Sequence, residues 1–172
     1  AEYANENPIL QLPKGEIIKR GLDYLYVPLL EYIISVLART MTAEQAQAAI
    51  TTRPNQNPDV PALLNFFLKN QAFFPELAPV VEEVYQVKRV RNAWAHSEPL
   101  DDTIILTFLL SSEKIVTKIV TMDKRVALDQ LTALRQCHLL KLAELTVQEM
   151  SQQDAQGNTM LVYPVLVPAF DD

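Results

Sequence analysis

The chain has 172 residues, of which 49% are hydrophobic, and a formal net charge of −6. This length and apolar content predict one globular domain with a buried core and exclude a disordered chain. The single cysteine, Cys137, excludes an internal disulfide and favours a reducing, cytoplasmic environment. The sequence shows neither a secretory leader nor an apolar run long enough to cross a bilayer, so no membrane association is expected.

The first predicted elements are two helices. Residues 14–40 carry apolar side chains at helical spacing, which predicts a long helix with a kink or a break at Pro28. Thr42 is a good N-cap, and Gln45 lies at capping-box distance from it. A second, shorter helix is therefore expected over residues 43–50.

A third helix is predicted to begin near Pro61, because proline suits the first turn of a helix. Asp59 or Val60 is expected near its N-cap, and the helix is expected to run through Phe74. Its bulky side chains are predicted to lie in the core: Leu63, Leu64, Phe66, Phe67, Phe73 and Phe74.

The fourth predicted helix covers residues 75–95. At about 100° per residue, most of its apolar side chains fall on one arc, which includes Trp94 and places it in the core. Arg91 falls near the middle of this arc, where a charge is costly unless it is paired, faces a wet cavity or meets a partner. His96 points about 140° away from Arg91 on an ideal helix, so one straight helix cannot direct both side chains into one site. Either the helix ends before His96, or the long arginine side chain swings round, or the site is completed across two subunits.

Two further helices complete the predicted bundle. Residues 103–121 follow Asp101 and Asp102, either of which can cap a helix. This segment is rich in Ile, Val and Thr, so a strand is the alternative. Residues 123–150 are predicted as a final helix capped by Asp123.

The predicted fold class is therefore mostly α. Residues 1–150 are expected to form an up-and-down bundle of four to five helices, and residues 151–172 a short extended C-terminal arm or linker. The arm is predicted because the apolar stretch Met160–Val167 is interrupted by Pro164, which suits an edge strand or a docked segment.

The most informative stretch is Val90–Pro99, with the sequence VRNAWAHSEP. An arginine can hold a phosphate bidentately and stabilise developing negative charge. A histidine can move a proton near neutral pH. Arg91 and His96 therefore provide the two groups needed to cleave a phosphodiester without a metal, and Asn92 could orient one of them or a phosphate oxygen.

The spacing of Arg91 and His96, with Asn92 directly after the arginine, resembles the R-x4-H signature of the HEPN superfamily of helical-bundle nucleases. The longer run RNxWAH, followed by an acidic residue and a proline, is similar to one HEPN subgroup found in bacterial defence and RNA-processing proteins. The longer run is the more specific signal, since it fixes a Trp and a His in place. The resemblance covers residues 14–121.

This resemblance implies a metal-independent endoribonuclease, active as a toxin or antiviral defence module. His96 would act as general base or general acid, Arg91 would stabilise the phosphorane, and Asn92 would position one of them. Lys88 and Arg89 are expected to bind RNA. The resemblance also implies a homodimer with its cleft at the two-fold interface, and either an antitoxin or a larger multidomain protein as partner. No cofactor is expected.

The alternative is a non-catalytic HEPN-like dimerisation or RNA/nucleotide-binding module. A net charge of −6 is unfavourable for holding nucleic acid, and a short basic run such as Lys88 and Arg89 is more commonly a solvated helix face. On this interpretation Arg91 forms a salt bridge, for example to Glu83, and His96 caps the end of a helix.

Other polar residues are less informative. Lys14, Lys19, Arg20 and Glu31 could line a cleft opposite the motif helix. The adjacent pair Cys137–His138 predicts no metal site, because neighbouring residues on a helix point about 100° apart and no third ligand is near in sequence.

Overall fold

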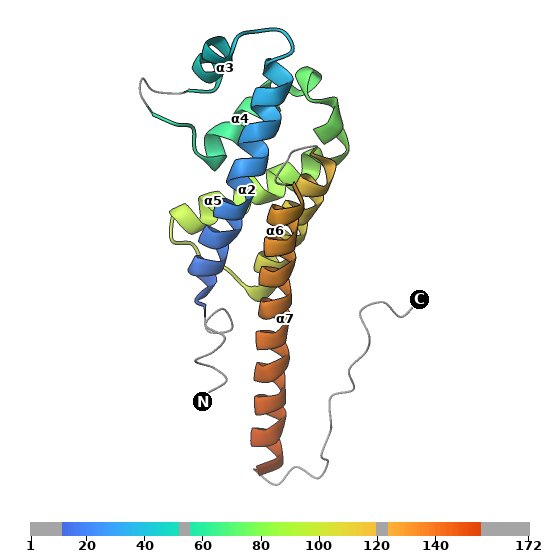
Figure 1. Ribbon diagram of the computed structural model, residues 1–172. Coiled ribbons are helices and arrows are strands. Elements are labelled where there is room, and N and C mark those ends of the chain that lie inside the picture. Colours follow the sequence, from blue (N-terminus) through green and yellow to red (C-terminus); the bar gives the residue numbers. More distant parts are fainter. Residues whose placement is uncertain (1–11, 52–55, 120–123, 156–172) are drawn as a thin grey trace. The chain divides into compact units, whose positions relative to one another are not determined.

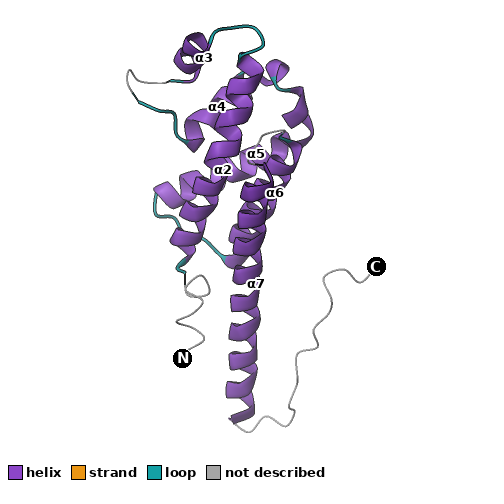
Figure 2. Ribbon diagram, in the orientation of Figure 1, coloured by secondary structure: helices purple, strands orange, loops and turns teal. Residues whose placement is uncertain are grey.

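The computed structural model describes residues 12–51, 56–119 and 124–155. Within these ranges the chain is almost entirely helical and contains no strand, so the predicted mostly α class is confirmed (Figures 1 and 2). The α-helices are α2 (Lys14–Leu37), α3 (Ala43–Ile50), α4 (Val60–Lys69), α5 (Val81–Ala95), α6 (Asp102–Lys118) and α7 (Lys124–Ala155), and short 3₁₀ helices, η2 (Gln71–Phe73) and η3 (Pro75–Val80), join α4 to α5.

Three of these helices begin where the sequence supplies an N-cap. Thr42 Oγ1 accepts a hydrogen bond from the backbone N–H of Gln45, whose side chain in turn accepts one from the N–H of Thr42. Asp59 caps α4 and Asp101 caps α6, each accepting a bond from the N–H three residues further on. The capping residues predicted for these helices are confirmed, and residues 103–118 are helix rather than strand.

Residues 12–135 form one compact unit, and the remainder of α7, from Gln136, belongs to a second unit. In the first unit α2 packs against α4 and α6, and α5 packs mainly against α6. Gly21 permits the close approach of α2 and α6, because a Cβ there would lie 2.5 Å from Cε2 of Phe108. The core of this unit includes Ile18, Leu25, Leu29, Ile33, Leu63, Leu64, Phe67, Phe74, Phe108 and Leu109.

Of the kink or break predicted at Pro28, the break is absent. Helix α2 runs without interruption from Lys14 to Leu37, and Pro28 is buried within it. Proline removes one backbone hydrogen bond from a helix, but burial of α2 along much of its length stabilises the remainder of the ladder.

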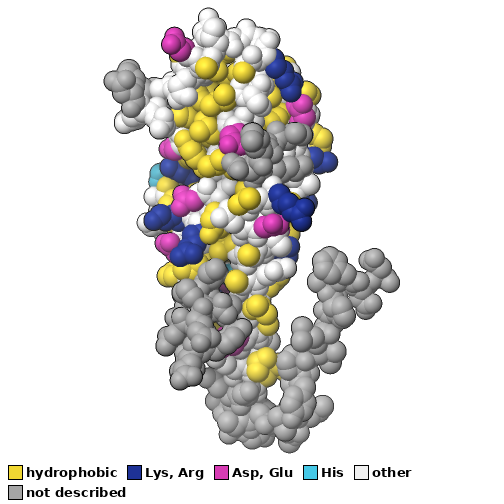
Figure 3. Space-filling model, in the orientation of Figure 1, with side chains coloured by type: hydrophobic (Ala, Val, Ile, Leu, Met, Phe, Trp, Pro, Cys, Tyr) yellow, Lys and Arg dark blue, Asp and Glu magenta, His cyan; other side chains and the backbone are white. Residues whose placement is uncertain are grey.

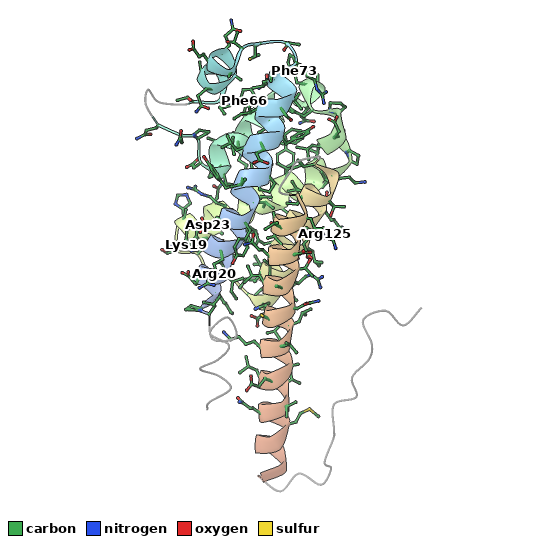
Figure 4. The ribbon with its side chains drawn as sticks, in the orientation of Figure 1. Lys19, Arg20, Asp23, Phe66, Phe73 and Arg125 are labelled. Carbon is green, nitrogen blue, oxygen red and sulfur yellow. The ribbon has the colours of Figure 1, made fainter. Side chains whose placement is uncertain are left out.

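The end of the third predicted helix also differs. Helix α4 stops at Lys69, and the tight turn of η2 leaves the Phe73 side chain 58% exposed, while Phe74 is fully buried. Phe66 is half-buried, and both Phe66 and Phe73 lie towards the end of the unit where α2 finishes (Figure 4). The core placement predicted for Phe73 is therefore wrong, because the side chains of Phe73 and Phe74 point in different directions from this turn.

The predicted fourth helix is divided into two parts. Residues 75–80 form η3, and α5 begins only at Val81. Pro79 has no N–H to donate and disfavours the α conformation in the residue before it, so a continuous α-helix from Pro75 is broken at this point.

Helix α7 is longer than predicted. It continues to Ala155, so residues 151–155 are helical rather than part of an extended arm. Asp123, which was predicted to cap this helix, and the remainder of the predicted arm, including Met160–Val167, lie outside the described residues. Across the described ranges, no helix has the length and apolar character needed to cross a membrane.

Candidate functional site

The RNxWAH stretch ends α5 in a Schellman motif. The N–H of Ser97 bonds to the carbonyl of Trp94 at 3.1 Å, and the N–H of Glu98 bonds to the carbonyl of Ala93 at 2.9 Å. Ser97 has a φ of 55°, in the left-handed region that glycine usually occupies at this position. His96 is the C-cap residue of α5, and its side chain is exposed. The polar end of the motif therefore lies where the chain turns away from the helix.

Arg91 lies in the wall of a cavity of about 470 Å³. Val84, Val87 and Val90 of the same helix are buried in the core, but Arg91 is only half-buried. The cavity lies between α2, the start of α4 and α5, and is lined by Lys19, Leu22, Asp23, Tyr26, Pro58, Asp59, Val60, Pro61, Arg91 and Trp94. The charge of Arg91, on an otherwise apolar face of α5, therefore lies at a cavity within one chain.

Among the described residues Arg91 forms no ion pair and no hydrogen bond through its side chain. Glu83, the partner suggested by the scaffold interpretation, lies within 3.6 Å of Lys114 instead. A half-buried guanidinium that faces a cavity without a carboxylate partner is suited to hold an anion.

The cavity contains both signs of charge. Lys19 and Asp23 lie one turn apart on α2 (Figure 4), and neither forms an ion pair within the described part of the chain. One oxygen of the Asp59 carboxylate is already hydrogen-bonded, since Oδ1 accepts the N–H of Ala62 at 3.0 Å and caps α4. On the face drawn in Figure 3, basic and acidic side chains gather along the edge formed by the first turns of α2 and the end of α5.

Trp94 is half-buried rather than fully in the core as predicted. Its indole packs over Gly15 of α2, where an added Cβ would lie 3.2 Å from Nε1. One side of the indole lines the Arg91 cavity, and Trp94 also borders a smaller depression of about 280 Å³ beside Ser97. Because Gly15 has no side chain, the Trp94 indole can lie against α2, where Trp94 borders both the Arg91 cavity and the smaller depression.

The structure does not bring His96 into the lining of the Arg91 cavity. His96 is exposed at the C-cap of α5, which ends at Ala95. Asn92 is half-buried and also lies outside that lining. Lys88 is half-buried and Arg89 is exposed, and neither borders the cavity.

Of the four residues suggested for a cleft opposite the motif helix, Lys19 lines the Arg91 cavity. Lys14 is paired with Asp102 at 3.7 Å, and Arg20 is paired with Glu16 at 3.6 Å. Sequence reasoning missed Asp23 and Tyr26, although both lie near Lys19 at i+4 and i+7 on one face of α2.

The Cys137–His138 pair lies in the second unit. His138 is buried, and burial raises the pKa of the Cys137 thiol above its ordinary value, which disfavours the reactive thiolate. Across the described ranges, no three His, Cys, Asp or Glu side chains come together in a group that could hold a metal ion.

Comparisons of the chain with protein-family models, with curated proteins and with solved structures found no match.

Proposed function

We propose that the chain is a metal-independent endoribonuclease of HEPN type. The observation that carries this proposal is the state of Arg91, a half-buried guanidinium that faces an open cavity and has no ionic partner in the described part of the chain. Such a group stabilises the charge that develops on a phosphate during cleavage. His96, exposed five residues later at the end of α5, is accessible to exchange a proton with substrate.

In the proposed reaction the 2′-hydroxyl of a ribose loses its proton and its oxygen attacks the adjacent phosphorus. The bond from phosphorus to the 5′-oxygen then breaks, and that oxygen takes up a proton. The products are a 2′,3′-cyclic phosphate and a 5′-hydroxyl. His96 removes the first proton or supplies the second, Arg91 stabilises the phosphorane, and Asn92 holds a phosphate oxygen or orients one of these side chains.

The proposed site is completed by a second copy of the chain. Within one chain His96 lies outside the Arg91 cavity, so the proposal pairs His96 of one protomer with Arg91 of its partner across a two-fold axis. A mixture of the inactive variants Arg91→Ala and His96→Ala tests this pairing. Mixed dimers contain one intact site only if the two residues come from different chains, so recovery of activity on mixing is expected. No recovery after verified subunit exchange contradicts a shared site.

The chemistry is tested by incubating RNA with the wild type and its variants in EDTA. His96→Ala should lower the rate by about 10²–10⁴, the usual contribution of a positioned acid or base. Arg91→Lys should also be severely impaired, because an ammonium lacks the bidentate fork. Arg20→Lys, at an arginine paired on the surface, is the matched control and should retain activity. Full inhibition by EDTA, cleavage of 2′-O-methyl RNA, or an active His96→Ala variant would reject the mechanism.

A second candidate is a non-catalytic dimerisation or RNA/nucleotide-binding module. The same separation of Arg91 from His96 within one chain favours it, since the Arg91 cavity can bind an anion without His96. RNA binding by the wild type without cleavage, with Lys88 and Arg89 contributing to affinity, would select this function.

The proposed ribonuclease would act in the cytoplasm as a toxin or antiviral defence protein. Its activity would be restrained by an antitoxin or by the other domains of a larger protein. To identify such a partner, candidate proteins are co-expressed with the chain. A partner should restore the growth of cells that carry the active chain and have no effect on cells that carry His96→Ala.

A further inference from the structure

The Arg91 cavity has the size and the walls of a site for one nucleotide. Its volume of about 470 Å³ is within the range of cavities that enclose small organic ligands. Tyr26 and Trp94 are both half-buried and line it, so each leaves part of its ring accessible. A nucleobase stacks favourably on an aromatic side chain, whatever the identity of the base. The two rings therefore provide apolar contacts for a base.

The charges in the cavity limit the ligand to a single phosphate. Lys19 and Arg91 supply two cations, and Asp23 and Asp59 supply two carboxylates. The two cations suffice for one phosphate, and the two carboxylates leave no surplus positive charge for more. A triphosphate would bring several further negative charges into a cavity that already holds two, and like charges at short range repel.

Asp23 is the side chain in this cavity best suited to distinguish one base from another. It forms no hydrogen bond or ion pair among the described residues, whereas Asp59 is engaged at the cap of α4. An ionised carboxylate only accepts hydrogen bonds. It therefore accepts one from the exocyclic amino group of cytosine, as acidic side chains do in nucleic-acid complexes. Uracil presents a carbonyl oxygen at the same position, and two acceptors cannot form a hydrogen bond.

We infer that the Arg91 cavity is a specificity subsite for one nucleotide of the RNA strand, and that Asp23 selects cytosine over uracil there. Lys19 and Arg91 bind the phosphate, and Tyr26 and Trp94 contact the base. This inference rests on the proposed function only in taking the nucleotide to be part of an RNA strand. Binding of the nucleotide depends on the cavity residues alone.

The first test uses Trp94, the single tryptophan of the chain, as a reporter inside the cavity. Its fluorescence is followed while CMP or UMP is titrated into the full chain in the absence of RNA. CMP should quench it saturably and bind about tenfold more tightly than UMP, which corresponds to one hydrogen-bond preference of roughly 1.4 kcal/mol. No saturable change with CMP, or equal affinity for CMP and UMP, overturns the inference.

Substitution of Asp23 separates base selection from simple charge. An asparagine can donate to the uracil carbonyl as well as accept, so Asp23→Asn should reduce the CMP-to-UMP affinity ratio to near one. Asp129→Asn, at an exposed aspartate outside the cavity, is the matched control and should keep the wild-type ratio. Lys19→Gln should weaken both nucleotides equally and leave the ratio unchanged. An Asp23→Asn variant with the wild-type ratio overturns the assignment.

A cleavage assay distinguishes failure of this inference from failure of the proposed function. Oligonucleotides that differ only in C or U are incubated with the wild type and Asp23→Asn. Cleavage at both bases with equal rates in the two proteins rejects the subsite and retains the ribonuclease. Asp23-dependent binding of CMP with no cleavage of any RNA rejects the ribonuclease and retains the subsite.

Discussion

The indole of Trp94 lies directly over Gly15, so closely that a Cβ on Gly15 would be 3.2 Å from Nε1. Gly15 is in the first turn of α2, and Trp94 is in the last turn of α5. This contact fixes the position of the indole beside the Arg91 cavity.

Gly15→Ala is expected to displace Trp94 by a few tenths of an ångström without unfolding the protein. The free energy of unfolding should change by less than about 1 kcal/mol, because the higher helix propensity of alanine offsets part of the crowding. The displacement should shift the fluorescence emission of Trp94 and weaken nucleotide binding in the cavity. An unchanged emission spectrum would show that the contact does not hold the indole.

Gly21→Ala should have a much larger effect on stability. A Cβ at this position would lie 2.5 Å and 2.9 Å from ring atoms of Phe108, which is fully buried between α2 and α6. Overpacking of this kind lowers the free energy of unfolding by about 1–3 kcal/mol. Urea denaturation measures the loss, and Gly15→Ala serves as the control at a site where the neighbour can move.

Ser97→Gly should stabilise the protein. Ser97 adopts a φ of 55° at the end of α5, and a residue other than glycine pays roughly 1–2 kcal/mol for this conformation. Glycine removes this cost but gains freedom in the unfolded chain, so a net gain of about 0.5–1 kcal/mol in the free energy of unfolding is expected. Ser97→Ala keeps the steric cost and should give no gain. A loss of stability in Ser97→Gly would indicate that the serine side chain makes a stabilising contact.

Arg135→Met should destabilise the junction of α6 and α7. The Arg135 guanidinium contacts Glu113 through Nε at 2.6 Å and Nη2 at 3.3 Å, and the hydroxyl of Thr132 donates to the same carboxylate. The Glu113 side chain is only 12% exposed, so loss of its partner should cost about 1.5–3 kcal/mol. Lys114→Met breaks a pair whose lysine is 63% exposed and should cost less than about 1 kcal/mol. Equal effects of the two substitutions in thermal or urea denaturation would contradict this ranking.

The hydrogen bond between Tyr32 and Glu76 predicts a dependence of stability on pH at both ends of the scale. The Tyr32 hydroxyl donates to Glu76 at 2.6 Å, and this bond lowers the pKa of the Glu76 carboxyl below its ordinary 4.5. Burial, followed by the same hydrogen bond, raises the pKa of Tyr32 above its ordinary 10.0. The Glu76 contribution is therefore present above pH 4.5 and is lost as pH falls through the lowered pKa. The Tyr32 contribution is present below pH 10.0 and is lost as pH rises towards the raised pKa.

Tyr32→Phe removes the donor and the titrating hydroxyl together. The difference in free energy of unfolding between the wild type and Tyr32→Phe should be largest between these two limits and should shrink outside them. Urea denaturation across the pH range measures this difference. If the difference in free energy of unfolding is the same at every pH, the hydrogen bond does not depend on the protonation of Glu76 or of Tyr32.

The features that were predicted correctly from the sequence depend on interactions between residues close together in the chain. Thr42 with Gln45, Asp59 and Asp101 were predicted as capping residues because a capping hydrogen bond spans only three positions.

The features that could not be predicted depend on how separate segments pack. Neither Asp23 nor Tyr26 carries a local signal of function, and they become part of a site only because α2 lies beside α5. The half-buried position of Trp94, against Gly15 and in the lining of the cavity, depends on the packing of α5 beside α2. The continuity of α2 through Pro28 likewise depends on tertiary burial.

Asp59 belongs both to the wall of the cavity and to the first turn of α4, since its Oδ1 accepts the N–H of Ala62 while the side chain lines the Arg91 cavity. Occupation of the cavity is therefore expected to change how often the first turn of α4 opens. A ligand that restricts the Asp59 side chain should lengthen the lifetime of the hydrogen bond to Ala62, and a ligand that draws the carboxylate away should expose that amide to solvent. The rate at which the Ala62 amide proton exchanges with water is thus a local measure of whether the cavity is filled, independent of any change in Trp94.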